Sequence, residues 1–369
     1  MVSYAQNENG MVIPYEIVGG KMCVNMKVDN VEHRFIFDTG GQTMVVNKLK
    51  EELGMHFVDS MTVTDATSIK RTYPRYAIDK ATFNGGRYIL RNIPALIMEE
   101  ENKVLDCFNV VGIIGNDIIS KFILQIDPEK KEITLLPPSS KVNTSLRNMV
   151  KFEPNKSNMP MFLIGLESGE TMKALFDTGS KYFLSILPAA LDKLQGTPAV
   201  EVTHEGQGRT SMGITGTLNL QDKQLASLPL VTVGTGKFGN VLASTSQVPV
   251  SLLGVELLQY GKVTIDYGHS RFYFEPFEKK IITPAGESLW NVGLIVADGV
   301  LRIASLWDDM KQQVEIGDEV LKVDGQDVPP VDFCESVING LKFLKDKDKV
   351  ELTVKNKGQV KVITASKMK

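Results

Sequence analysis

Apolar and polar residues alternate in short runs over most of this chain, and turn residues separate the runs. The clearest runs are residues 22–28 and 31–37, followed in the second half of the chain by 161–166 and 171–176. Alternation with a period of two buries one face of a strand, and two such runs around a tight turn predict a hairpin. We therefore expect a mainly β protein whose core comes from alternating strand faces.

Helical patterns are few and short in the first three quarters of the chain. Short helices are predicted at residues 46–53 and 188–194, and each ends near a glycine, which commonly terminates a helix. The segment 137–140, with the sequence Pro-Pro-Ser-Ser, is typical of a linker. This linker divides the strand-rich region into two parts of similar length, 1–140 and 141–280.

The sequence Phe-Asp-Thr-Gly occurs twice, at residues 37–40 and 176–179, and each copy ends an apolar, strand-like run. The two aspartates, Asp38 and Asp177, lie 139 residues apart. Two further short motifs repeat with the same offset of 139 residues. One is a glycine after two apolar residues, at Gly115 and Gly254, and the other is an aspartate after an isoleucine, at Asp127 and Asp266. Three anchors in one register indicate an internal duplication.

A carboxylate on a tight turn at the end of a strand is well placed to act as a reactive group. Gly40 and Gly179 allow backbone conformations that a Cβ would forbid, and Thr39 and Thr178 add hydroxyls that can bond within or between the halves. If the halves pack about a pseudo-two-fold axis, the aspartates meet there and share one proton. One would act as a general base on water and the other as a general acid toward a carbonyl, which hydrolyses a peptide without a metal, thiol or serine nucleophile.

These residues resemble those of the retropepsin-like aspartic proteases, in a bacterial tandem form with two lobes in one chain. The resemblance covers roughly residues 15–277 and implies two acid-protease β-barrel lobes with Asp38 and Asp177 as the catalytic pair. It implies reciprocal hydrogen bonds between the lobes by Thr39 and Thr178, close approach at Gly40 and Gly179, and closure of a structural loop by Gly115 and Gly254. Because both lobes lie in one chain, it also implies activity as a monomer.

The two motifs differ in the residue that follows them. Ser180 follows the second motif, and its hydroxyl could bond the outer oxygen of Asp177. Gly41 follows the first motif and has no side chain to do the same for Asp38. We expect the Asp38 side of the pair to be held less strongly in its ionised form, because it lacks one donor.

Proteases of this family close glycine-bearing hairpins, or flaps, over the bound peptide. Residues 206–216 are rich in glycine and suit this role. The corresponding stretch of the first half, 64–78, has no glycine but holds Tyr73, Pro74 and Tyr76. We expect two unequal flaps, and the alternative is that both stretches are ordinary polar hairpins.

The repeat ends near residue 276, and residues 281–369 have the length and pattern of a separate small domain. Gly-Asp and Asp-Gly turns within 316–328 frame alternating apolar residues, which predicts a hairpin. A helix is expected at 331–344, with strands at 350–354 and 360–364.

This C-terminal segment resembles a PDZ domain, most clearly in its Gly-Asp and Asp-Gly turns. Val292, Gly293 and Leu294 lie where that family has its carboxylate-binding loop. By resemblance, backbone N–H groups there would bind the C-terminus of a peptide, and the ligand would add a strand to the edge of the sheet. The alternative for these three residues is the plain start of a strand.

Composition and charge narrow the range of partners. The 369-residue chain has a net charge of −3 and no long basic run, which argues against nucleic acid as a partner. No apolar run approaches the length of a membrane span. The histidines and cysteines lack metal-ligand spacing, so we expect neither a metal nor a cofactor. The expected partners are a peptide or protein substrate and a C-terminal peptide at the PDZ-like segment.

The three cysteines, Cys23, Cys107 and Cys334, lie far apart in the sequence. We expect free buried thiols, with a Cys23–Cys107 bridge as the alternative. Residues 3–6, Ser-Tyr-Ala-Gln, resemble the end of a cleaved export signal, although an incidental polar tail would look the same. Together with the resemblance to a duplicated protease, this favours a periplasmic or exported protein.

The sequence thus predicts an aspartic endopeptidase whose PDZ-like domain recruits a substrate or partner or restrains access to the cleft. Three alternatives stay open. The chain could be a pseudoprotease that keeps the fold as a peptide-binding module, which Gly41 and the glycine-free first flap favour and the two retained aspartates oppose. It could be a scaffold in which the PDZ-like domain does the main work, or the halves could fail to pair, so that the aspartates never meet.

Overall fold

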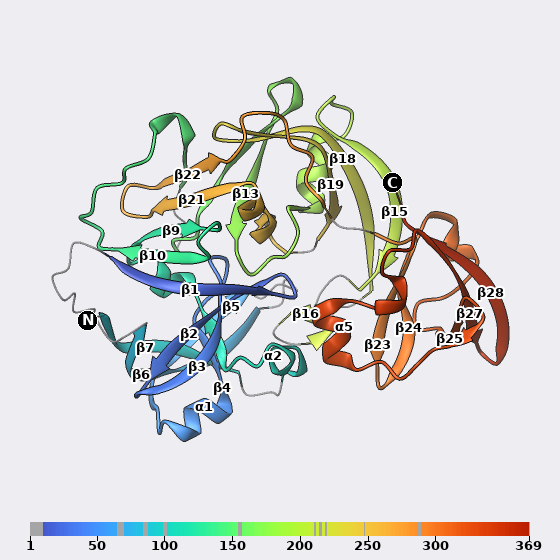
Figure 1. Cartoon of the computed structure of the whole chain (residues 1–369), viewed down its shortest axis with the longest axis horizontal. Helices are drawn as coiled ribbons and strands as arrows, with labels where there is room; N and C mark the ends of the chain where they lie inside the picture. Colours follow the sequence, from blue (N-terminus) through green and yellow to red (C-terminus); the bar gives the residue numbers. More distant parts are fainter. Residues whose placement is uncertain are drawn as a thin grey trace.

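The structure is a computed structural model, and it describes residues 10–64, 70–83, 88–98, 102–153, 157–209, 212–213, 216–217, 220–246, 248–286 and 289–368. The protein is mainly β, with 54% of residues in strands and 15% in helices. It contains a six-stranded mixed β-barrel and a second large mixed sheet (Figure 1).

The first half of the chain builds the barrel. The strands of this half are β1 (Met11–Val18), β2 (Lys21–Val28), β3 (Val31–Phe37), β4 (Met44–Val46), β5 (His56–Thr64), β6 (Lys70–Phe83), β7 (Tyr88–Met98), β8 (Gly112–Ile114), β9 (Ile123–Asp127) and β10 (Glu132–Leu136). Its helices are α1 (Asn47–Glu52), α2 (Lys103–Cys107) and α3 (Asn116–Ile119). Strand β8 is parallel to β3 and antiparallel to β4, and pairing of β2 with β6 closes the path β2-β3-β8-β4-β7-β6.

The second half repeats this topology. Its strands are β11 (Met149–Lys151), β12 (Met161–Leu166), β13 (Thr171–Asp177), β14 (Leu184–Ile186), β15 (Glu201–Gly208), β16 (Met212–Gly213), β17 (Gly216–Thr217), β18 (Gln221–Val233), β19 (Gly236–Thr245), β20 (Ser251–Gly254), β21 (Gly261–Asp266) and β22 (Arg271–Pro276). The α-helix is α4 (Pro188–Leu194), and 3₁₀ turns are η2 (Leu146–Asn148), η3 (Glu167–Gly169) and η4 (Val255–Gln259). Strand β20 lies between its parallel neighbour β13 and its antiparallel neighbour β14, and β12 pairs with β18.

The C-terminal unit, residues 289–368, has its own buried cluster but is not separate from the second half. It contains β23 (Val292–Ala297), β24 (Val300–Trp307), η5 (Asp308–Gln312), β25 (Glu319–Val323), β26 (Gln326–Asp327), α5 (Phe333–Asn339), η6 (Lys342–Leu344), β27 (Lys349–Asn356) and β28 (Gln359–Ser366). Strand β24 pairs antiparallel with β15, so one sheet runs from the second half into this unit. Figure 1 shows the unit, in orange and red, beside both halves.

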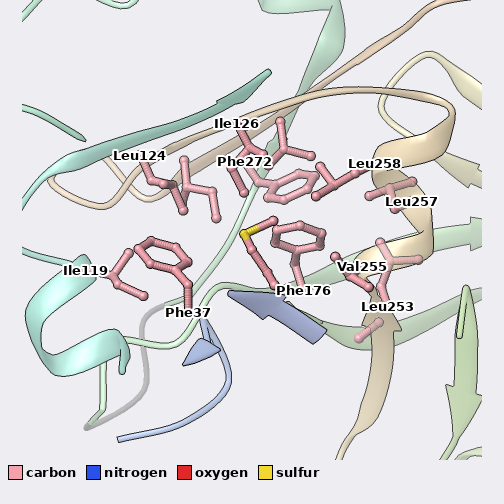
Figure 2. Packing of buried hydrophobic residues seen from close by; sticks show 14 of the residues in the cluster. Phe37, Ile119, Leu124, Ile126, Phe176, Leu253, Val255, Leu257, Leu258 and Phe272 are labelled. Atoms are coloured by element: carbon pink, nitrogen blue, oxygen red, sulfur yellow. The ribbon is translucent and has the colours of Figure 1, made fainter. Parts of the chain in front are cut away.

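The two halves share a sheet and a core. The strands β11, β22 and β21 of the second half join β9, β10 and β1 of the first, with β21 paired to β9. Figure 2 shows Phe37 and Phe176, which precede the two aspartates, packed in one cluster with Ile126 and Phe272. Because both phenylalanines are fully buried, the two motif strands are fixed by the same apolar packing.

The predicted hairpins, strands and the two short helices of the first two parts are confirmed, within a residue or two at their ends. The C-terminal hairpin is confirmed as well, with positive φ angles at Asp324 (50°) and Gly325 (76°), as a tight hairpin turn requires. The helix predicted at 331–344 is too long, because Gly340 has a φ of 73° and ends α5.

The expectation of free cysteines is wrong for two of the three. Cys107 on α2 and Cys334 on α5 form a disulfide between residues 227 apart in the sequence, so the alternative bridge from Cys23 to Cys107 is wrong too. Cys23 is free and buried. The bridge exists because α2 of the first half packs against α5 of the C-terminal unit, a contact between distant segments that no local pattern reveals.

Some expectations fall outside the described residues. Residues 3–6, which resemble the end of an export signal, all lie outside the described residues. Of the two expected flaps, 65–69 and much of 210–219 lie outside as well. Within the described residues, no helix is both long and apolar enough to span a membrane.

Candidate active site

The two Asp-Thr-Gly turns meet where the halves join. Asp38 directly follows β3, and Asp177 ends β13, where it pairs with Gly254 of β20. Each carboxyl lies against the glycine of the opposite motif, which places the two aspartates within hydrogen-bonding reach of each other. The structure therefore brings both predicted aspartates into one site and rules out halves that fail to pair.

Four reciprocal hydrogen bonds hold the two turns together. The backbone N–H of Thr39 donates to Oγ1 of Thr178, and the N–H of Thr178 donates to Oγ1 of Thr39, both at 3.1 Å. Each hydroxyl then donates at 2.7 Å to a carbonyl of the opposite half, Thr39 to Phe176 and Thr178 to Phe37. Both threonines are fully buried, so loss of either hydroxyl would leave two backbone groups of the opposite half without this partner.

The motif glycines allow the carboxyls to approach the opposite turn. A Cβ placed on Gly40 would lie 2.5 Å from Cγ of Asp177, and one on Gly179 would lie 2.7 Å from Cγ of Asp38. No side chain fits at such distances. The N–H groups of Gly40 and Gly179 each donate at 2.8 Å to Oδ1 of the aspartate two residues before.

Burial and the second carboxyl change the protonation of the pair. Burial, followed by the charge and hydrogen bond of Asp38, raises the pKa of Asp177 well above its usual range. The positive charge of Lys21 and the N–H of Gly179 oppose this rise. Asp177 therefore keeps its proton to a higher pH than an ordinary aspartate does, as one member of a closely spaced carboxyl pair does.

Within the described residues, the Ser180 hydroxyl does not make the hydrogen bond that was expected to hold Asp177 in its ionised form. The backbone N–H of Ser180 bonds the Asp177 carbonyl, at 3.1 Å. At Gly41 a Cβ would lie 2.7 Å from Oδ2 of Asp38, so a glycine there leaves room for this carboxylate. Burial and the neighbouring carboxyl, rather than a bond from Ser180, dominate the pKa of Asp177.

Gly115 follows β8 and Gly254 ends β20, and a Cβ on either would lie within 2.2 Å of the backbone of the segment that follows the motif of its half, at Gln42 and Tyr182. The N–H of Gly115 donates at 3.0 Å to Oγ1 of Thr43, whose own N–H and hydroxyl each donate at 2.8 Å to Asp117. In the second half, the Glu256 carboxylate accepts from the N–H of Phe183 at 3.0 Å. Asp117 and Glu256 also lie 139 residues apart, so the repeat contained a signal for this pair that the sequence analysis missed.

A cavity of about 450 Å³ opens at the dyad. Both halves line it, and α2 contributes Val104 and Leu105. The hairpin β5–β6 contributes Val63 and Tyr73, and the hairpin β15–β18 contributes Lys223. The hairpins that carry the two expected flaps thus border the cavity with different side chains. None of the described residues of the expected second flap, 206–216, lines the cavity, so the prediction of unequal flaps stays a prediction.

Lys21 is a residue of the site that the sequence analysis missed. Its Nζ donates a hydrogen bond to the carbonyl oxygen of Gly179, and its charge lowers the pKa of Asp177. It reaches the motif of the opposite half from the start of β2, directly after the turn at Gly20. A single lysine at the start of a strand has no local pattern that would mark this role.

The residues of the expected carboxylate-binding loop lie apart from the dyad. Val292, Gly293 and Leu294 begin β23, with Val292 paired to Leu306 and Gly293 to Ser305 of β24. None of the three lines the cavity at the aspartates. They are the start of a strand in the C-terminal unit, and within the described residues β24 is the strand partner of β23.

Known proteins give no further guidance to the chemistry of this site. No protein-family model matches the chain, and no curated protein matches it. Within the described ranges, no three His, Cys, Asp or Glu residues are grouped to hold a metal ion. The interpretation of the site therefore depends on the geometry and charge of the residues around Asp38 and Asp177.

Proposed function

We propose that this chain is an aspartic endopeptidase that hydrolyses peptide bonds with a water molecule activated between Asp38 and Asp177. The observation that carries the proposal is the reciprocal bonding of Thr39 and Thr178, because it holds carboxyls of two different halves within hydrogen-bonding reach of each other. A partly buried pair of neighbouring carboxyls adds little to stability, since taking charge out of water is costly, and this supports a chemical role.

The proposed fold has two retropepsin-like lobes, residues 1–140 and 141–280, followed by a PDZ-like domain at 281–369. Equivalent pairings support the two lobes: β3 with β8 in the first half corresponds to β13 with β20 in the second, and both are parallel. The hairpin at β25–β26 and the order of strands and helix after it support the PDZ-like domain. We assign this domain the recruitment of a substrate or partner peptide.

In the proposed mechanism the two carboxyls have different roles. Asp177, which carries the proton, donates it to the oxygen of the scissile carbonyl, while the Asp38 carboxylate takes a proton from the attacking water. The water oxygen forms a bond to the carbonyl carbon and gives a tetrahedral diol. The proton on Asp38 then passes to the leaving nitrogen, the C–N bond breaks, and Asp177 recovers its proton from the diol.

The proposed location is the periplasm or the cell exterior. The disulfide between Cys107 and Cys334 supports this, because such bonds persist in oxidising compartments and are rare in the reducing cytosol. A monomer suffices for the proposed activity, because one chain supplies both aspartates.

The proposal is tested by cleavage of a broad peptide library by the full chain from about pH 3 to about pH 8, with products read by mass spectrometry. Asp38→Asn and Asp177→Asn should each reduce cleavage at least about a hundredfold, because each removes one member of the acid–base pair. Asp298→Asn is the matched control, since this exposed turn residue has a φ of 51°, which asparagine adopts readily.

The outcomes separate the proposed enzyme from the alternatives. Loss of cleavage in both dyad variants, with normal cleavage by the control, supports the endopeptidase. Cleavage that survives in either dyad variant contradicts a shared acid–base pair. No cleavage by the intact chain at any pH would favour a peptide-binding module instead.

A further inference from the structure

The cleft at the dyad is made of two subsites whose residues can be matched from strand pairing alone. In the first half Met44 of β4 pairs with Ile113 of β8, and in the second half Ser185 of β14 pairs with Leu252 of β20. Ile113 and Leu252 are equivalent, because they lie 139 residues apart, the offset of the two aspartates. Met44 and Ser185 therefore occupy equivalent places.

The next strand of each half continues the match. Leu96 of β7 pairs in parallel with Met44, as Ser244 of β19 does with Ser185, so Leu96 and Ser244 are equivalent. Arg75 lies opposite the first of these two residues and Leu225 opposite the second. The outer strand of each flap hairpin has an irregularity next to this point, between Phe57 and Asp59 in β5 and between Val202 and His204 in β15.

By the same strand registers, Tyr73 and Lys223 occupy equivalent positions in the two halves. Tyr73 stands two residues before Arg75 on β6, and Lys223 stands two residues before Leu225 on β18. Both side chains line the cavity at the dyad. The flaps thus present an aromatic ring on one side and an ammonium group on the other.

The two subsites differ in chemistry at every one of these three matched places. The first half has Met44, Leu96 and Tyr73, and the second half has Ser185, Ser244 and Lys223, all of which line the cavity. At these three places the first subsite is therefore apolar and aromatic, whereas the second is polar and basic. The matched positions Ile113 and Leu252 are apolar in both halves, so the difference lies in the strands beside them.

Charge strengthens this contrast. Only 8% of the Lys223 surface is exposed, and its Nζ lies 5.8 Å from the centroid of the Trp307 ring, a cation–π arrangement. Within the described residues, the other charged groups that line the cavity are the dyad and two further lysines, Lys21 and Lys181. A carboxylate brought near a largely buried ammonium forms a charge-assisted hydrogen bond, which is stronger than a neutral one.

We infer that the cleft selects an extended peptide with a bulky apolar side chain on one side of the scissile bond and an acidic side chain on the other. The first-half subsite takes the apolar side chain, and Lys223 in the second-half subsite binds the glutamate or aspartate. This inference depends on the proposed endopeptidase function and adds its substrate class. Lys223 is then a specificity-determining residue rather than a catalytic one.

The test uses matched peptides that keep leucine on one side of the scissile bond and carry glutamate, glutamine or lysine on the other, in both orders. For the full chain we expect kcat/KM for glutamate to exceed that for glutamine on the order of tenfold, mainly through KM. Lys223→Met should remove this preference, Lys223→Arg should keep it, and Lys223→Glu should favour lysine. Lys193→Met, an exposed lysine on α4 away from the cavity, is the control and should behave as the native chain does.

Failure of this inference is distinguishable from failure of the proposed function. If the native chain cleaves the peptides without preferring glutamate, or if Lys223→Met keeps the preference, the inferred specificity is overturned and the endopeptidase stands. If the native chain cleaves no peptide at all, the proposed function falls and the inference with it. Should Lys223→Met not fold, the salt dependence of the native preference decides, because a preference based on an ion pair weakens as salt is added.

Discussion

In the first half of the molecule, Thr39 donates to the carbonyl of Phe176, and in the second half Thr178 donates to that of Phe37 at the same 2.7 Å. The hairpins above these turns do not match in this way. Within the described residues β5 pairs with β6 alone, whereas β15 pairs with β18 and also with β24 of the C-terminal unit. The halves are therefore alike at the dyad and different at the flaps.

The contact with the C-terminal unit depends on a small residue in the second flap. Gly206 of β15 pairs with Trp307, and a Cβ on Gly206 would lie 2.7 Å from atoms of the Trp307 ring. Beside it, the His204 ring is 2.6 Å from the carboxylate of Asp308. The first flap has Met61 at the place that Gly206 takes in the second, opposite Tyr73 instead of Lys223.

The difference between the dyad and the hairpins shows which parts of a duplicated structure must keep the same geometry in both halves. Two carboxyls that share a proton need both turns in the same geometry, so the bonds that hold them come in equal pairs. The flaps and cavity walls meet other molecules or another part of the chain, and nothing in the dyad requires them to match. The two hairpins and the two subsites can therefore differ around one symmetric pair of carboxyls.

The largest expected effect is the loss of stability when either threonine hydroxyl beside the dyad is removed. Because the bonds come in equal pairs, the two losses should be equal. Thr39→Val and Thr178→Val should each lower the free energy of unfolding by about 2 to 5 kcal/mol, because each strands two buried backbone groups. The measurement is the midpoint of urea unfolding. A cost below about 1 kcal/mol in either variant, or clearly unequal costs, would break the symmetry claimed for this network.

The two halves hold the C-terminal unit in different ways: the first half by a disulfide and the second half by strand pairing. Replacing Cys107 and Cys334 together by serine should cost about 2 to 4 kcal/mol, because the bridge closes a long loop. Hydrogen exchange should rise in α2 and α5 and stay low in β15 and β24, where strand pairing continues. Exchange that rises equally at β15 would mean that the bridge, rather than the strand pairing, docks the unit on the second half.

The flap contact can be tested by a matched pair of alanine variants. Gly206→Ala should cost about 1 to 3 kcal/mol, since the new methyl group must displace Trp307 or the strand. Met61→Ala at the equivalent place is partly exposed and should cost less than about 1 kcal/mol. Thermal unfolding of the two variants checks this, and equal costs would show that the second flap is not closely packed against the C-terminal unit.

A smaller effect concerns the pH dependence of stability. Because the pKa of Asp177 is raised in the folded protein, its contribution to stability is full below the pKa of the unfolded chain and is lost as the pH rises through the folded value. Asp177→Asn removes this loss, so the variant should gain stability relative to the native chain as the pH rises toward neutrality. Urea unfolding at several pH values measures the gain, and a gain that grew toward acid pH instead would contradict the raised pKa.

The sequence predicted the site better than it predicted the contacts around it. Asp38 and Asp177 could be found because a duplicated motif repeats at a fixed offset, and their turns are local structures that glycine and threonine specify. Even the overlong C-terminal helix was a local error, because the pattern of apolar residues continued past Gly340.

The contacts that were missed join segments distant in the sequence. Lys21 reaches the opposite half, Cys107 bonds Cys334, and Lys223 meets Trp307, and none of these residues has a neighbour in sequence that marks its partner. Such contacts arise only once the whole chain has packed. Lys223 could be matched to Tyr73 only after the strand registers were known.

The measurement that most directly tests the central claim is an NMR titration of the aspartate side-chain carboxyl carbons in the full chain, with Asp38→Asn for comparison. We predict that Asp177 titrates well above an ordinary aspartate, and that its pKa falls when Asp38 loses its charge, because that charge is one cause of the rise. Coupled titration would establish that two distant motifs form one proton-sharing site. Two independent carboxyls that titrate in the ordinary range, unchanged by Asp38→Asn, would contradict it.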